Sequence, residues 1–179
     1  MKQSLTDHPT ATIYQYKHVK RIIVRNEMLV SYLLCALILL GFQYTVDRLY
    51  GLFSWAIGFA AVQIIHLLII LITFINVHQA ADRKWRWSIV PPWTGFKPAN
   101  DISFSVFRKV HIQLFWLGLI IIAILYPWLP PSLMLSLFFW HIWLLSPKLL
   151  LQLRLRKFSK TKKASILRIQ TKEVNLYQP

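Results

Sequence analysis

Charged residues leave three long uncharged gaps along the chain, at 28–46, 49–81 and 110–147. A helix needs about 20 mainly apolar residues to cross the hydrocarbon core of a bilayer. The third gap is long enough for two short helices, and three prolines mark a turn in its middle: Pro127, Pro130 and Pro131. The last helix extends past Lys148, whose amine is expected to snorkel to the interface. The pattern predicts four transmembrane helices, at about 28–46, 51–77, 110–127 and 132–151.

The apolar runs are continuous rather than alternating, as in LLIILITFINV at 67–77. A membrane barrel would alternate over segments of about ten residues, whereas a helix pairs all its backbone groups within lipid. Composition agrees, because 56% of the residues are hydrophobic and only 15% are charged, against about 25% charged in soluble domains. The expected fold class is an all-α integral membrane protein whose four transmembrane helices form two hairpins.

The chain carries 21 Lys and Arg against 6 Asp and Glu. Every basic residue except Arg48 falls in the tail 1–27, in the loop 78–109 or from Lys148 onward. Basic residues are retained on the cytoplasmic side, so we expect a multi-pass protein of the inner or plasma membrane with both termini cytoplasmic. The chain then divides into a basic N-terminal tail (1–27), a four-helix domain (28–151) and a basic C-terminal tail (152–179).

The cytoplasmic segments leave alternatives open. The loop 78–109 mixes Trp, Pro and basic residues, which favours a segment lying on the headgroups, with a partner-binding loop as the alternative. Asn100 or Asp101 is the expected N-cap of the third helix. The two tails alternate partly in polarity, so they either pair as a small sheet or leave an interfacial helix around 17–27. Two strands alone would be marginal in water.

A polybasic stretch follows the last predicted helix. Such a stretch is attracted to anionic phospholipids by about 1 kcal/mol per basic residue near the surface. Because no nucleic-acid recognition motif accompanies the charge, nucleic acid is not an expected partner. The residues expected to contact anionic lipid are Arg154, Arg156, Lys157, Lys160, Lys162 and Lys163.

Small and polar residues gather on one side of the second predicted helix when it is drawn as a wheel. Small residues let helices approach closely, and polar ones bond across the interface. Bulky residues such as Ile64 and Leu71 fall on the opposite side. The expected packing face comprises Ser54, Gly58, Ala61, Gln63, Thr73 and Asn76.

Histidines are the candidate chemical groups within the spans. His66 and His141 lie on different helices, the minimum for holding haem b. Counted from the outer turns at 1.5 Å per residue, however, their depths differ by roughly 7 Å. The favoured interpretation is therefore that each makes one interhelical hydrogen bond. A weaker candidate is a metal site of His78, Asp82 and His111. Cys35, the only cysteine, is expected to be a small buried apolar side chain.

No catalytic set, phosphate-binding loop or charged residue deep within a span points to an enzyme. We therefore expect a non-enzymatic accessory, assembly or regulatory partner of another membrane component, or a protein that associates with itself. One alternative is a haem-binding redox subunit that uses His66 and His141. Another is a component of an oligomeric transporter, with Gln63, His66, Thr73 and Asn76 lining the path. A lipid or quinone enzyme at His78, Asp82 and His111 comes third.

Overall fold

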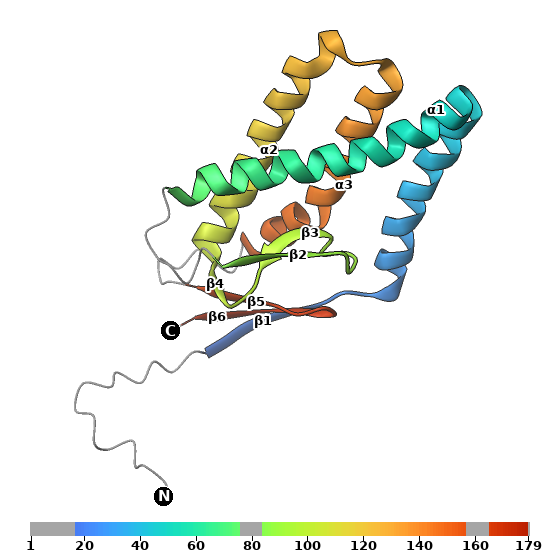
Figure 1. Cartoon of the computed structure of the whole chain (residues 1–179). Helices are drawn as coiled ribbons and strands as arrows, with labels where there is room; N and C mark the ends of the chain where they lie inside the picture. The colour runs from blue at the N-terminus through green and yellow to red at the C-terminus, as the bar shows by residue number, and fades with distance from the viewer. Residues whose placement is uncertain (1–16, 76–83, 157–164, 179) are drawn as a thin grey trace, which may run out of the picture.

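A computed structural model describes residues 17–75, 84–156 and 165–178. Among these residues, three helices are long and apolar enough to cross a membrane: α1 (Asn26–Ile75), α2 with the short η3 that follows it (Phe104–Leu125 and Tyr126–Trp128), and α3 (Pro131–Arg156). The helices cross one another above a layer of strands (Figure 1).

The helix α1 is two helical segments joined by a sharp bend at Arg48. This residue has φ 52° and ψ −130°, which lie outside helical geometry. The segments diverge from the bend (Figure 1), and their backbones approach each other closely at Gly51. A Cβ atom there would lie 2.2 Å from the backbone oxygen of Gln43. Glycine is needed at position 51 because the two backbones meet.

The bend in α1 and the η3 turn lie at the same end of the helices. Gln43 Nε2 donates to the backbone oxygen of Ser132 at 2.8 Å and to Ser136 Oγ at 2.7 Å. Asp47 also accepts a hydrogen bond from the Ser132 hydroxyl. These contacts tie the end of the first segment of α1 to the start of α3. The chain therefore reverses at the bend and again at η3, and both reversals lie side by side at one end.

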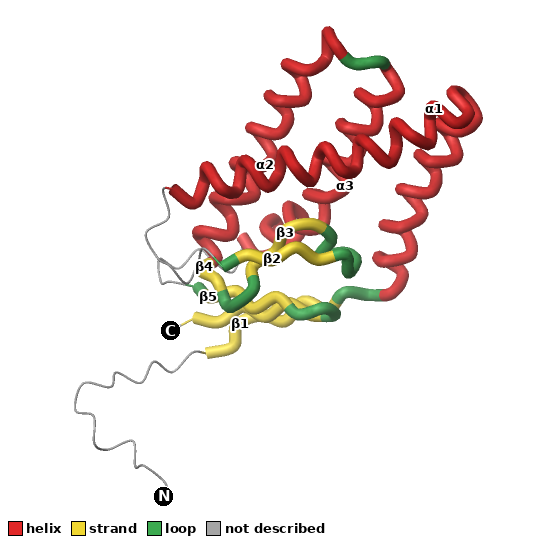
Figure 2. The backbone as a smooth tube through the Cα atoms, viewed as in Figure 1, coloured by secondary structure: helices red, strands yellow, loops and turns green. Residues whose placement is uncertain are grey.

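The strands gather at the opposite end, where the sequence left a small sheet of the two tails and an interfacial helix as alternatives (Figure 2). A four-stranded sheet has the order β1-β6-β5-β4, with all three strand pairs antiparallel. A separate hairpin pairs β2 with β3. The strands are β1 (Lys17–Ile23), β2 (Trp85–Ser88), β3 (Gly95–Pro98), β4 (Ile102–Ser103), β5 (Ile166–Ile169) and β6 (Glu173–Gln178).

The structure is mostly helical, as predicted, but the all-α prediction is wrong at the end where the strands lie. The two tails fold together, since β1 pairs with β6, and 17–23 is a strand rather than part of an interfacial helix. Four strands are enough because one face of the sheet is covered. Leu167, Val174 and Leu176 pack with Phe104, Phe107, Leu151 and Leu155 from the helix ends. This core supplies the burial that two isolated strands would lack.

The loop before α2 also differs from the prediction. Instead of one segment lying on headgroups, it forms the β2–β3 hairpin and β4. Trp93 is 3% exposed and donates to the backbone oxygen of Thr171, so its ring packs on the sheet rather than in a headgroup layer. The helix α2 begins at Phe104, and Asp101 is bound to Arg168 instead of serving as its N-cap.

The outer face of the sheet is polar. Arg168 contacts Asp101 at 2.7 Å, and its guanidinium lies 5.6 Å from the centre of the Tyr177 ring. Glu173 accepts a hydrogen bond from Asn175 Nδ2 and pairs with Arg21, and these contacts hold the pKa of Glu173 below its usual value. Strand β1 is thus joined to β6 by an ion pair as well as by backbone hydrogen bonds.

Candidate functional site

The centre of the helical layer is a pair of buried histidines. His66 Nε2 on α1 lies 3.0 Å from His141 Nδ1 on α3. His141 Nε2 lies 3.1 Å from the backbone oxygen of Phe115 on α2. The two residues are 3% and 0% exposed. His141 therefore connects all three helices.

The acceptor at Phe115 fixes the direction of this hydrogen-bond chain. A carbonyl oxygen only accepts, so His141 Nε2 carries the proton and donates. In a neutral ring His141 Nδ1 is then the acceptor, and it receives the proton of His66 Nε2. Both nitrogens of His141 are thus occupied without a charge on either ring.

The sequence estimate that these rings differ in depth by roughly 7 Å does not hold, because they touch. Residue counting measures depth only for helices that run parallel, whereas the second segment of α1 crosses α2 and α3 obliquely (Figure 1). In this arrangement His66 Nε2 is bonded to His141 Nδ1 and His141 Nε2 is bonded to the Phe115 carbonyl, so none of these three nitrogens is free to ligate haem iron. Haem binding by both histidines would require the two rings to separate.

Gly118 on α2 makes the histidine contact possible. A Cβ atom at Gly118 would lie 2.2 Å from His141 Cε1 and 2.8 Å from His141 Nδ1. A second close approach occurs at Gly58 on α1, where a Cβ atom would lie 2.5 Å from the Cβ atom of Ser136 on α3. Small residues thus set both spacings around α3.

The predicted packing face of α1 points partly toward its neighbours. Ser54, Gly58 and Thr73 are buried, Ala61 and Gln63 are half-buried, and Asn76 lies outside the described residues. Thr73 Oγ1 donates to the backbone oxygen of Ile69 on its own helix, so it makes no interhelical bond there. Gln43, which the wheel of the second predicted helix did not include, makes two hydrogen bonds from α1 to α3.

A second polar centre surrounds Lys148 on α3, and sequence reasoning missed it. Lys148 is 3% exposed, and its Nζ donates to the backbone oxygen of Thr94 at 3.0 Å. The amine therefore turns inward instead of snorkelling to the interface. A Cβ atom on Gly95 would lie 3.5 Å from Lys148 Nζ and 3.4 Å from Gln63 Oε1, so both side chains converge on the β2–β3 hairpin.

Several polar atoms of this region have no hydrogen-bond partner among the described residues. They are both amide atoms of Gln63 and Nε2 of His111. Buried polar groups are normally paired, so this part of the helical layer has unused hydrogen-bonding capacity. In the sequence, Lys148 follows an apolar helix and precedes three leucines. This pattern does not determine whether the amine points into the protein or out to the membrane interface.

The proposed metal site cannot be assembled from the described residues. His78 and Asp82 lie outside them, and His111 Nδ1 is 2.8 Å from the backbone oxygen of Phe107 on its own helix. No group of three His, Cys, Asp or Glu within 17–75, 84–156 and 165–178 is arranged to hold a metal ion. Of the basic residues expected to contact lipid, Arg154 and Arg156 are exposed, and the other four lie outside the described ranges.

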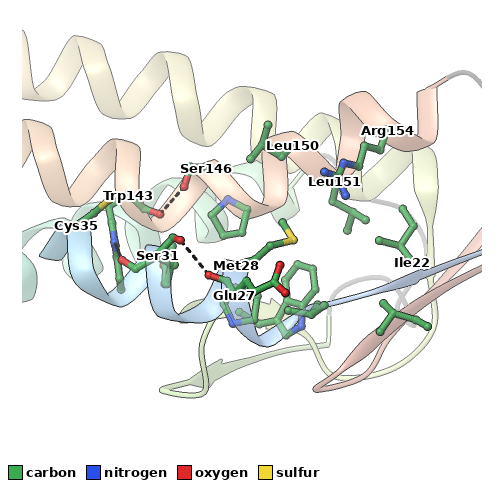
Figure 3. Close-up of a pocket in the computed structure, with 16 residues that line it drawn as sticks. Ile22, Glu27, Met28, Ser31, Cys35, Trp143, Ser146, Leu150, Leu151 and Arg154 are labelled. Carbon is green, nitrogen blue, oxygen red and sulfur yellow. Dashed lines mark hydrogen bonds between the residues drawn. The ribbon is translucent and has the colours of Figure 1, made fainter.

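A groove of about 470 Å³ lies between the first segment of α1 and α3 (Figure 3). Tyr32 and Trp143 stack at its inner end with ring centres 3.8 Å apart, and Trp143 Nε1 donates to the backbone oxygen of Tyr32. Cys35 lines the groove and is exposed, which corrects the expectation of a buried cysteine. The lining consists of Ile22, Ile23, Val24, Glu27, Met28, Ser31, Tyr32, Cys35, Pro92, Trp93, Trp143, Ser146, Pro147, Leu150, Leu151 and Arg154.

Comparisons with known proteins found no match. No family model, no curated protein and no solved structure is similar to this chain at the level required for significance.

Proposed function

We propose that the chain is a multi-pass protein of the cell membrane that crosses it four times with both termini in the cytoplasm. The bend at Arg48 supports four crossings, because the helix on each side of it reaches the about 20 residues that one crossing needs. The two chain reversals lie at one end, and the strands with most of the basic residues lie at the other. That distribution of charge favours the strand end as cytoplasmic.

We further propose that the protein acts without catalysis, as an accessory or regulatory partner of another membrane component. The observation that carries this proposal is the sheet built from both tails. A topology signal needs only positive charge, whereas this sheet orders segments from opposite ends of the chain. It presents a fixed polar face that includes Arg168 and Tyr177. Such a face is suited to contact with a partner at the membrane surface.

Two single-cysteine variants test orientation and partnership together. In a Cys35→Ser background, we place a cysteine at Lys172 in the β5–β6 turn or at Tyr50 beside the bend; both positions are exposed. In right-side-out vesicles, a membrane-impermeant thiol reagent is expected to label the cysteine at position 50 and not the one at 172. In intact cells, a bifunctional cross-linker is expected to give an adduct of constant mass from position 172 alone.

The reverse labelling pattern would overturn the cytoplasmic assignment. Equal adducts from both positions, or none from either, would contradict a partner on the sheet face. An adduct of twice the monomer mass would identify a second copy of this chain as the partner. The Cys35→Ser protein without an added cysteine is the matched control, since it has no thiol at all.

Lys148 favours a second candidate function, a component of a transport path. Ionisable groups held inside the helices of membrane proteins commonly line ion or proton routes, and Gln63 and His111 add unpaired polar atoms to the same region. If the protein transports ions, the buried Lys148 amine is retained for that function although it lowers stability. If Lys148 is only structural, its role is the hydrogen bond to the Thr94 carbonyl.

Lys148→Met is expected to raise the melting temperature of the detergent-solubilised protein. An apolar chain of similar length removes the cost of burying an amine, which exceeds what the bond to the Thr94 carbonyl returns. Lys172→Met, an exposed control, should leave the melting temperature unchanged. If Lys148→Met melts lower, the amine is a structural link. If it melts as high or higher but abolishes ion flux in liposomes, transport becomes the better function.

A further inference from the structure

The groove between α1 and α3 begins at the sheet and ends within the helical layer. Its lower rim is the Ile22–Val24 connection and Trp93, and its upper limit is Cys35. Cys35 lies nine residues after the start of α1, or roughly 13 Å along the helix. That is less than half of a hydrocarbon core of about 30 Å. The groove therefore spans the boundary between headgroups and hydrocarbon on the side of the sheet.

The walls of the groove are apolar although they contain two serines. Ser31 Oγ donates to the backbone oxygen of Glu27 at 2.9 Å. Ser146 Oγ donates to the backbone oxygen of Trp143 at 3.0 Å, the carbonyl that Pro147 cannot serve because it has no N–H. Figure 3 shows both bonds directed back to their own helices. Both serine hydroxyls are thus bonded within their own helices, and the exposed side chains at the opening, Met28 and Leu150, are apolar.

The charge at the rim is positive. Glu27 is paired with Arg25 at 3.0 Å, and both side chains are exposed. Arg154 on α3 also reaches the rim, and no ion pair or hydrogen bond of its guanidinium occurs among the described residues. A guanidinium is well suited to bidentate contact with phosphate. An apolar groove with the Arg154 guanidinium at its rim, at headgroup level, is complementary to a phosphate-bearing lipid.

We propose that this groove binds one phospholipid from the leaflet on the side of the sheet, with an acyl chain along Tyr32 and Cys35 and its phosphate on Arg154. Its volume falls within the about 300–1,000 Å³ typical of ligand sites. The proposal rests on the membrane location and not on the protein partner. The lipid would fill the space between the first segment of α1 and α3 that extends from the contact of Tyr32 with Trp143 toward the sheet.

The test uses detergent-purified protein incubated with dioleoylphosphatidylglycerol or dioleoylglycerol and examined by native mass spectrometry. The wild type is expected to retain one phosphatidylglycerol and little diacylglycerol. Cys35→Trp fills the groove and should lose the lipid, whereas Leu34→Trp, on an exposed neighbouring position, should retain it. Arg154→Gln should weaken retention about tenfold or more, since it removes a charge-assisted contact. Arg156→Gln, two residues further on and outside the groove, is its control.

Each alternative outcome would overturn part of the proposal. Absence of retained lipid in the wild type, or equal retention by Cys35→Trp and Leu34→Trp, would refute binding in the groove. Equal retention of diacylglycerol and phosphatidylglycerol would refute the role of Arg154. Ser31→Phe provides a second groove-filling variant if Cys35→Trp does not fold. Circular dichroism of each variant separates loss of lipid from loss of structure.

Discussion

Gly118→Val is expected to separate α2 from α3 and to lower stability by about 3–5 kcal/mol. The new Cβ would occupy the space of the His141 ring, since it would lie 2.2 Å from His141 Cε1. Overpacking of this kind costs about 1–3 kcal/mol. Moving the ring also breaks its bonds to His66 and Phe115, worth about 1 kcal/mol each within a membrane. Unfolding in mixed micelles, followed by tryptophan fluorescence, measures the change.

Gly41→Val is the matched control for this prediction. Gly41 also lies within a helix, but nothing comes within 4 Å of the position its Cβ would take. It should therefore differ from the wild type by helix propensity alone, within about 1 kcal/mol. Equal losses from the two variants would show that the histidine contact does not hold the helices together. Adding His141→Phe to Gly118→Val should not restore stability, because the phenyl ring and the valine would still compete for the space between α2 and α3.

The helices were predictable because lipid imposes a simple rule on sequence. Uncharged gaps of sufficient length located all three of the apolar helices, and the prolines at 127–131 located one of the reversals. The bend at Arg48 fell where charges interrupt the first two gaps. The sheet was harder to predict, because β4 has only two residues and β5 only four. Segments this short carry too little alternation to specify which partner they pair with.

The contacts of the candidate site depended on helix crossing, which residue counting does not give. His66 and His141 could be singled out as buried polar residues, but their direct bond follows from the oblique path of α1. Lys148 was misplaced for a related reason. Its inward direction is set by Thr94 on the loop before β3, a segment that the sequence suggested would lie on headgroups. The groove likewise needs α1, α3 and the hairpin placed together before it exists.

Leu176→Asp is expected to detach the sheet from the helix ends while leaving the helices intact. Leu176 is 0% exposed in the core shared with Phe107, Leu155 and Trp93. A carboxylate left there without a partner costs about 3–5 kcal/mol, and the sheet has no other apolar face to bury. Hydrogen exchange should show lost protection in β1, β5 and β6, with α2 and α3 still protected. Lys172→Asp, in the exposed turn of the same strands, should leave protection unchanged.

The same substitution separates the two roles proposed for the strand end. If the folded sheet is the partner surface, Leu176→Asp should abolish the cross-link from a cysteine at position 172 without changing its orientation, because the basic charge that sets topology is unaltered. If charge alone recruits the partner, the cross-link should survive the loss of strand protection. Retained protection in Leu176→Asp would instead show that the sheet does not depend on the helix ends. Leu176→Asp therefore allows strand protection and cross-linking to be measured in the same variant. The comparison shows whether the partner binds the folded sheet or only its charge.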